Sequence, residues 1–294
     1  MKLKILITGA SGQLGKSILK CLRSGCSSLG NIDSNYKDAH IVTPSSKELD
    51  VTNYASVMKY IEELSPQFII NLAAYTLVDN CEKENMKAFA VNSLGARNLA
   101  IAAEKVNAKI IYISTDYVFS GEGEKPYTEM DLPCPQNIYG KSKLLGEKYV
   151  MNFSSRYFIV RTSWLYSNYG KNFVSTIIDI AKDRGKLEVV KDQLGSPTSC
   201  DELVYHILKI LNTEEYGIYH CTGRGQCSWY DFATSILDFA HISCKITPIT
   251  SDKIKRLAKR PTFSVLHSVM LPCTIGNHMT HWQEALFNFM KNFK

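Results

Sequence analysis

Three polar side chains have the types and the spacing that the reduction of a carbonyl group requires. Tyr139 and Lys143 are four residues apart, so on a helix they lie on one face, one above the other. A phenol can deliver a proton to a carbonyl oxygen as negative charge develops there, although its ordinary pKa of ~10 makes it a weak acid at neutral pH. A nearby lysine ammonium stabilises the phenolate and lowers that pKa. Thr115 supplies a hydroxyl that can donate a hydrogen bond to the same oxygen.

A strand and a helix have to bring these groups together. The apolar run 110–113 is typical of a buried strand, and Thr115 follows its end. Open α/β sheets bind ligands at the carboxyl ends of their strands, so this position suits a site. A polar loop with three prolines, 122–137, then leads to a helical pattern that begins near Tyr139. Because Tyr-x-x-x-Lys pairs are also common on ordinary helix surfaces, the interpretation depends on the rest of the chain.

A glycine-rich turn near the start of the chain predicts a dinucleotide site. The strand pattern 3–8 runs into Gly9-Ala-Ser-Gly12-Gln-Leu-Gly15, and a helical pattern, 16–22, follows. Such a turn lets the backbone approach a pyrophosphate, which then sits at the N-terminus of the helix. A plain tight turn that only packs the helix is the alternative.

The loop after the second predicted strand, 40–43, bears on which dinucleotide is bound. Many dinucleotide sites carry an acid about 20 residues past the glycines, where it binds the ribose 2′-hydroxyl. This chain has Pro44-Ser-Ser-Lys47 at that place. Hydroxyls and an ammonium suit a 2′-phosphate, which favours NADPH and leaves NADH open. A solvated loop with no ligand is the alternative.

Strand and helix patterns alternate through the first half of the chain. This alternation predicts an α/β fold, a Rossmann-type doubly wound parallel sheet. The expected strands are 3–8, 40–43, 68–72, 109–113 and 157–161, and the expected helices include 54–64 and one long helix, 82–106.

The alternation weakens in the second half, where we expect a smaller mixed α/β substrate-binding domain. The predicted dinucleotide-binding domain is 1–163 with a return around 198–222. The predicted sugar-nucleotide-binding domain is 164–197 together with 223–294. A cleft between the two domains would hold the substrate.

Composition argues against several classes of protein. Hydrophobic residues make up 45% of the 294 residues and charged residues 21%, as in ordinary globular proteins. The net charge of +6 comes without a Lys/Arg block, so we expect no nucleic-acid partner. Neither a signal peptide nor a membrane-spanning stretch is indicated. Nine scattered cysteines without metal-site spacing suggest reduced thiols, so we expect a cytoplasmic protein without a membrane partner.

Several longer strings resemble one family. They are Gly12-Gln-Leu-Gly15, Asn71-Leu-Ala-Ala-Tyr-Thr-Leu-Val-Asp79, Ser114-Thr-Asp-Tyr-Val-Phe119, Tyr139-Gly-Lys-Ser-Lys-Leu-Leu-Gly-Glu147, Arg161-Thr-Ser-Trp-Leu-Tyr166, Asp192-Gln-Leu-Gly-Ser-Pro-Thr198 and Arg260-Pro261. Together they resemble the extended short-chain dehydrogenase/reductases and, among these, the dTDP-4-dehydrorhamnose reductase family. The resemblance covers residues 2 to about 266, and the segment 272–281 has no family pattern.

The resemblance implies an NAD(P)H-dependent oxidoreductase of dTDP-rhamnose, and hence polysaccharide, biosynthesis. Hydride would go to C4 of a dTDP-4-keto sugar while Tyr139 donates the proton. Lys143 would hold the nicotinamide ribose and tune Tyr139, Thr115 and Asp116 would touch the sugar, and Trp164 would contact the substrate. The predicted cofactor site comprises Gly9, Gly12, Gln13, Leu14, Gly15, Ser45, Asp50, Val51, Ala73, Ala74, Tyr75, Thr76, Tyr139 and Lys143.

Other functions fit parts of the same pattern. A related epimerase or dehydratase is one, although a dehydratase would be expected to carry a Glu after Asp116, where this chain has Tyr117. A non-enzymatic NADP-binding regulatory subunit, resembling the β subunit of methionine adenosyltransferase, is another. Some family members hold Mg²⁺ between acidic residues at a dimer interface, but no such ligands can be assigned here. Both a monomer and a homodimer stay open, and Trp164 could instead be a core residue.

Overall fold

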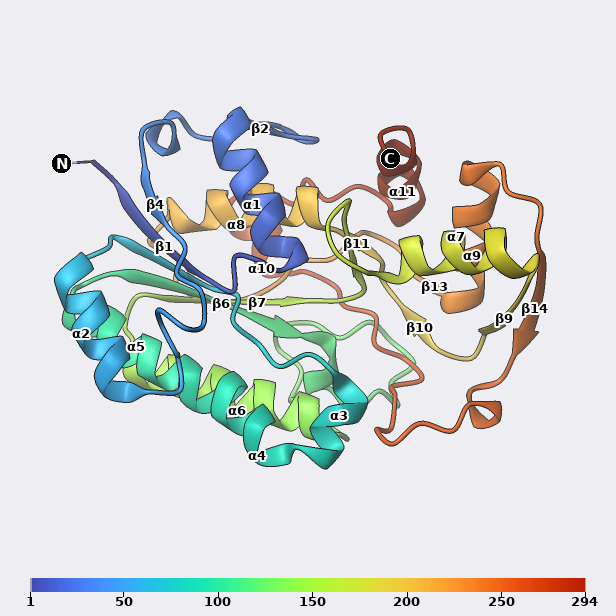
Figure 1. Ribbon diagram of the computed structural model, residues 1–294, viewed down its shortest axis with the longest axis horizontal. Coiled ribbons are helices and arrows are strands. Elements are labelled where there is room, and N and C mark those ends of the chain that lie inside the picture. Colours follow the sequence, from blue (N-terminus) through green and yellow to red (C-terminus); the bar gives the residue numbers. More distant parts are fainter. Residues whose placement is uncertain (1, 294) are drawn as a thin grey trace.

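The computed structural model, which describes residues 2–293, is built around a parallel sheet with helices on both faces (Figure 1). Across these residues the main sheet has six strands in the order β12-β7-β6-β5-β1-β4, and every pairing in it is parallel. The strands are β1 (Lys4–Thr8), β4 (His40–Val42), β5 (Phe68–Asn71), β6 (Lys109–Thr115), β7 (Tyr157–Thr162) and β12 (Gly217–His220). The predicted α/β class with a Rossmann-type parallel sheet is confirmed.

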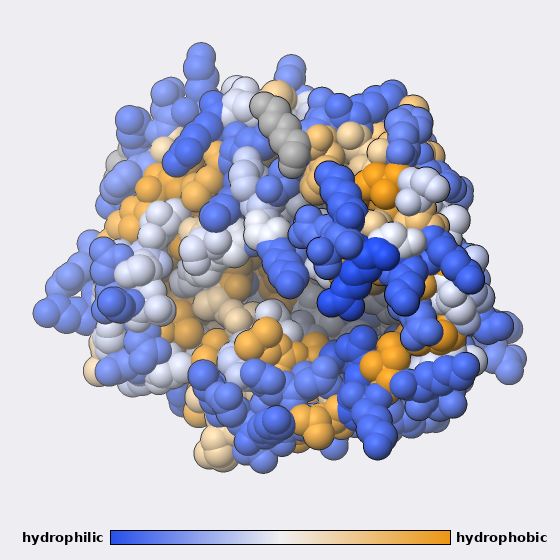
Figure 2. All heavy atoms as spheres, turned by 45° about the vertical axis from the view of Figure 1, so that its right-hand side comes forward, coloured by the Kyte–Doolittle hydropathy of each residue, from blue (hydrophilic) through white to orange (hydrophobic). Residues whose placement is uncertain are grey.

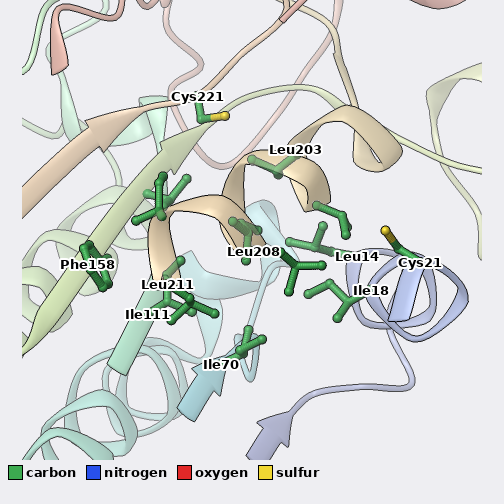
Figure 3. Close-up of a cluster of buried hydrophobic side chains, with 14 of the residues drawn as sticks. Leu14, Ile18, Cys21, Ile70, Ile111, Phe158, Leu203, Leu208, Leu211 and Cys221 are labelled. Carbon is green, nitrogen blue, oxygen red and sulfur yellow. The ribbon is translucent and has the colours of Figure 1, made fainter. Parts of the chain in front are cut away.

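Helices cover both faces of the sheet, which explains why its strands are continuous apolar runs. Helices α1 (Gln13–Ser24) and α8 (Cys200–Leu211) pack on one face, where Leu14, Ile18 and Leu203 meet Ile70 and Ile111 (Figure 3). Helices α2 (Tyr54–Leu64), α5 (Ala96–Lys105) and α6 (Ile138–Phe153) lie on the other face. Because both groups of helices pack on the faces of the sheet, the carboxyl ends of the strands stay free for a site.

The register of the sheet sets polar side chains side by side at this edge. Thr8 at the end of β1 pairs with Asn71 at the end of β5. Thr115 at the end of β6 pairs with Thr162 at the end of β7. The strands therefore deliver hydroxyl and amide groups together at their carboxyl ends.

The predicted long helix over 82–106 is helical from residue 85 to 105, but it starts later than expected and contains a π-helical segment. The chain forms α3 (Val78–Lys83), α4 (Asn85–Phe89) and a π-helical segment, η2 (Ala90–Gly95), before α5 begins. The buried side chain of Asn92 accepts from the backbone N–H of Tyr75 at 2.7 Å and donates to the Ser142 hydroxyl at 2.9 Å. A π-bulge shifts the helical phase, and Leu94 within this segment is 45% exposed.

The second half of the chain forms a smaller mixed layer beside the strand ends (Figure 1). Helices α7 (Phe173–Arg184), α9 (Trp229–Ala240) and α11 (Trp282–Met290) share a cluster of buried side chains with β9 (Lys186–Val190). Strand β9 pairs in parallel with β14 (Lys245–Ile249). Ser228 caps α9, with Asp231 completing a capping box.

Short elements join the two parts and complete the chain. Strand β12 and helix α8, both late in the sequence, return to the main sheet. The remaining strands and helices are β2 (Cys26–Ser27), β3 (Gly30–Asn31), β8 (Leu165–Tyr166), β10 (Leu194–Gly195), β11 (Thr198–Ser199), β13 (Cys227–Ser228), α10 (Met270–Thr274) and the 3-10 turns η1 (Ser34–Tyr36), η3 (Asp116–Val118) and η4 (Ser251–Lys253). Among the helices of residues 2–293, none has both the length and the apolar character needed to cross a membrane.

Candidate active site

A cleft of about 1120 Å³ lies over the carboxyl ends of β1, β5, β6 and β7. One face of the molecule, mostly hydrophilic at its rim, is visibly hollowed near its centre (Figure 2). The cleft joins the glycine turn to the catalytic candidates. The predicted residues that line it are Gly9, Gly12, Gln13, Leu14, Gly15, Ser45, Asp50, Val51, Ala73, Ala74, Thr76, Thr115, Asp116, Tyr139, Lys143 and Trp164.

Tyr75 is the predicted site residue that the structure does not bring to the lining of the cleft. Both backbone groups of Tyr75 bond to the side chain of Asn92, its N–H at 2.7 Å and its carbonyl at 3.0 Å. Its ring lies under the ammonium of Lys87, 4.9 Å from the ring centre. These contacts turn Tyr75 toward α4, while its neighbours Ala74 and Thr76 line the cleft.

The glycine turn has the close backbone contacts of an anion site. Gly9 has a φ of +66°, and a Cβ there would lie 2.7 Å from the backbone of Leu72. A Cβ on Gly15 would lie 2.5 Å from Cα of Ala10. Gly12 caps α1 without a side chain, so the first N–H groups of the helix, beginning with Gln13, have no helical partner. This cradle fits a pyrophosphate.

Close packing places Tyr139 beside the end of β6. Asn137 caps α6 by accepting a hydrogen bond from the Gly140 N–H at 2.8 Å. A Cβ on Gly140 would come within 2.1 Å of the Tyr117 carbonyl oxygen, so only glycine allows this approach of α6 to η3. The rings of Tyr117 and Tyr139 meet edge to face at 5.7 Å between centres. The predicted trio of Thr115, Tyr139 and Lys143 therefore faces one cleft.

Burial dominates the electrostatics of the trio. It raises the pKa of Tyr139, and the neighbouring hydroxyl of Thr115 works in the opposite direction. It lowers the pKa of Lys143 to about 7, against the favourable charge of Glu147. The Lys143 Nζ lies 3.9 Å from the centre of the Tyr112 ring. Desolvation is therefore the largest influence on the Tyr139 pKa in this structure, and the tuning of Tyr139 by Lys143 stays a prediction.

Asp116 is a buried residue in the lining of the cleft. Its Oδ1 accepts from the Thr115 hydroxyl at 2.9 Å, whereas its Oδ2 has no hydrogen-bond partner in residues 2–293. Burial raises the pKa of Asp116 to about 6. A buried polar atom without a partner is costly unless a ligand satisfies it.

Two tryptophans form one wall of the cleft. The rings of Trp164 and Trp229 stack at 3.4 Å between centres with planes 7° apart. Trp164 has a φ of +47°, and a Cβ on Gly195 would lie 2.4 Å from its ring. Sequence reasoning missed Trp229 as a residue of the cleft. It is the first residue of α9, directly after the cap residue Ser228.

Other residues near the predicted site differ from expectation. Asn172, Gly195 and Thr198 do not line the cleft, and Asn172 caps α7. Glu48, which sequence reasoning overlooked, lines the cleft and accepts the Ser45 N–H at 2.8 Å, whereas Lys47 does not line it. Within residues 2–293 no three His, Cys, Asp or Glu side chains gather to hold a metal ion.

Comparisons with known proteins agree with this geometry. A family model described as the RmlD substrate binding domain matches residues 2–294. A dTDP-4-dehydrorhamnose reductase from Aggregatibacter actinomycetemcomitans is 39% identical over 298 residues, 97% of each chain. The structure of such a reductase from Clostridium acetobutylicum has a TM-score of 0.93 at 44% identity over 99% of both chains. A Bacillus anthracis reductase, solved in complex with NADP, has a TM-score of 0.93 at 41% identity, covering 99% of this chain and 100% of that one.

Proposed function

The chain belongs to the RmlD substrate binding domain family, and on that basis we propose that it reduces dTDP-4-dehydro-6-deoxy-L-mannose (dTDP-4-dehydrorhamnose) to dTDP-L-rhamnose with NADPH. The resemblance drawn from sequence motifs is confirmed, and the family match extends it to the C-terminal segment. The observation that carries the proposal is the single cleft that joins the glycine turn to Thr115, Tyr139 and Lys143.

The residues of the cleft divide between cofactor and sugar. Bound NADPH supplies the hydride that C4 of the sugar receives. The N–H groups at the start of α1 and the glycine turn fit the pyrophosphate, and Lys143 is placed to bind the nicotinamide ribose. Asp116 and Trp164 are placed to contact the sugar. We assign the cofactor to 1–163 with the return around 198–222, and the sugar nucleotide to 164–197 and 223–294.

Tyr139 acts as the proton donor in this proposal. Its raised pKa keeps the phenol protonated at neutral pH, so the proton is available when hydride reaches C4. The C4 oxygen takes that proton and becomes a hydroxyl, and the phenol becomes a phenolate. Thr115 lies beside the phenol and can turn its hydroxyl hydrogen from Asp116 to the phenolate, and the charge of a protonated Lys143 also stabilises the phenolate.

The preference for NADPH rests on the cleft wall after β4. Ser45 and Ser46 line this end and suit a 2′-phosphate, and NADP in the related Bacillus anthracis structure supports the choice. Glu48 places a carboxylate at the same end, and its charge opposes a phosphate. We therefore expect the protein to bind both dinucleotides, with NADPH at least as tight as NADH.

One incubation tests the proposal. The protein is mixed with NADPH and dTDP-4-dehydrorhamnose, oxidation of NADPH is followed by absorbance, and the product is identified by NMR. We expect dTDP-L-rhamnose. A product epimeric at C4 would contradict the rhamnose assignment alone. No oxidation with any dTDP-4-keto sugar would contradict the reductase and favour the non-enzymatic regulatory relative.

A further inference from the structure

Among residues 2–293, the hydroxyl of Thr162 has no hydrogen-bond partner, and the proposed function gives it no role. Thr162 is the last residue of β7 and is 4% exposed. Its Oγ1 is buried without a partner among residues 2–293, and the residue lines the cleft. Neighbouring hydroxyls are satisfied: Ser163 donates to the Ser196 carbonyl at 2.7 Å, and Ser114 donates to Glu147 at 2.5 Å.

The position of Thr162 places this hydroxyl at the reacting end of the cleft. Thr162 pairs with Thr115 in the register of the parallel strands β6 and β7, so the two side chains lie on the same face of the sheet. The preceding pair, Ser114 and Arg161, is held by the carboxylate of Glu147, which fixes the two strand ends relative to one another. Thr162 is therefore rigidly placed beside a catalytic candidate.

A second unpartnered atom lies at the same edge. Four buried side-chain atoms in residues 2–293 have no partner, and two of them, Asp116 Oδ2 and Thr162 Oγ1, belong to residues that line the cleft. Native proteins satisfy nearly all buried polar atoms, so two unpartnered atoms on residues that line one cleft point to a bound ligand as their missing partner. Thr162 can both donate and accept, whereas an ionised carboxylate only accepts.

We propose that Thr162 is a binding residue whose hydroxyl bonds to the reacting end of the bound ligands. The group it fits offers both a donor and an acceptor, as the nicotinamide carboxamide and a sugar hydroxyl do. This inference rests on the proposed function, which supplies the identity of the ligands. It also explains why a strand keeps a threonine where an apolar β-branched residue would be more stable.

The test compares Thr162→Val, which replaces the hydroxyl with a methyl group, with Thr162→Ser, which keeps the hydroxyl. Dissociation constants for NADPH and for dTDP-L-rhamnose are measured directly by calorimetry, without turnover. We expect Thr162→Val to weaken at least one of them by about 3- to 10-fold and Thr162→Ser to restore most of the loss. If only NADPH affinity is lost, the partner of the Thr162 hydroxyl is the nicotinamide carboxamide. If only dTDP-L-rhamnose affinity is lost, the partner is a sugar hydroxyl.

The melting temperature tests the assignment independently of ligand binding. If the Thr162 hydroxyl had a structural role instead, its removal would lower the melting temperature. Thr162→Val should raise the melting temperature of the free protein by about 2 °C, because an unpaired buried hydroxyl is removed. Thr198→Val is the matched control: its buried hydroxyl accepts from the Gly223 N–H at 3.2 Å, so that variant should melt lower.

Two outcomes separate the inference from its premise. Unchanged affinities for both ligands in Thr162→Val, or a lowered melting temperature, would overturn the Thr162 assignment alone. A wild-type protein that binds neither ligand would overturn the proposed function and, with it, the role of Thr162.

Discussion

Glu147 and Arg161 form a buried two-pronged ion pair behind the cleft. Arg161 Nη2 lies 2.7 Å from Glu147 Oε2, and Arg161 Nε lies 2.9 Å from Oε1. Their side chains are 0% and 2% exposed. Glu147 stands one helical turn beyond Lys143 and also accepts the hydroxyl of Ser114, the residue before Thr115. One carboxylate thus ties α6 to the ends of β6 and β7.

Removing this carboxylate should strongly destabilise the fold. Glu147→Ala leaves the buried Arg161 charge without compensation, so the free energy of unfolding should fall by about 3–5 kcal/mol. Urea denaturation measures it. The double variant Glu147→Leu with Arg161→Met should recover much of the loss, since neither charge then remains buried. A loss below about 1 kcal/mol in Glu147→Ala would show that the pair is not a structural tie.

Tyr139→Phe should abolish most turnover and leave cofactor binding nearly unchanged. The phenol acts as charge develops on the C4 oxygen, so kcat should fall by about 10²–10⁴-fold, far more than KM changes. Steady-state kinetics and NADPH titration give the two quantities. Retention of more than about a tenth of the wild-type kcat would mean that another group donates the proton.

Lys143 should make stability depend on pH above neutrality. Its folded pKa of about 7 lies below its ordinary value of 10.5, so between these values the unfolded chain binds more protons. The free energy of unfolding should therefore rise as pH increases from 7 to 10.5. Below pH 7 the destabilisation that the buried Lys143 ammonium causes is fully present. Urea denaturation across this range compares wild type with Lys143→Met, in which that rise should shrink. Identical pH profiles would show that Lys143 is not desolvated.

Lys143→Ala should also weaken both turnover and NADPH affinity. One ammonium is placed to serve the ribose and the phenolate, so its loss should affect kcat and the NADPH dissociation constant together. Kinetics and titration of the same variant measure both. A change in kcat alone would assign Lys143 only to the support of Tyr139.

The preference for NADPH over NADH should depend on the polar and charged side chains that follow β4. Glu48→Gln removes a carboxylate from this wall, so it should tighten NADPH by about 2- to 5-fold and change NADH little. Ser45→Ala with Ser46→Ala should weaken NADPH selectively. Lys47→Ala is the control, because Lys47 does not line the cleft. A clear NADH preference of the wild type that survives Lys47→Ala would overturn the 2′-phosphate argument.

Local patterns in the sequence were sufficient for the class of fold and for much of the site. Strand and helix periodicity, the glycine turn and the spacing of Tyr139 and Lys143 act over a few residues, so they can be interpreted without knowing what packs against them. The capping of α9 by Ser228 and the span of α2 were predictable for the same reason.

Contacts between distant residues decided the rest. Asn92, in the π-helical segment of the expected long helix, bonds to Tyr75 and Ser142, and its bonds to Tyr75 hold that residue outside the lining of the cleft. The stacking of Trp229 on Trp164 joins residues that are far apart in the chain. Burial, which no spacing reveals, raises the Tyr139 pKa. The unpartnered hydroxyl of Thr162 likewise appears only once every neighbour is in place, because satisfaction of a buried polar atom is a property of the packed fold.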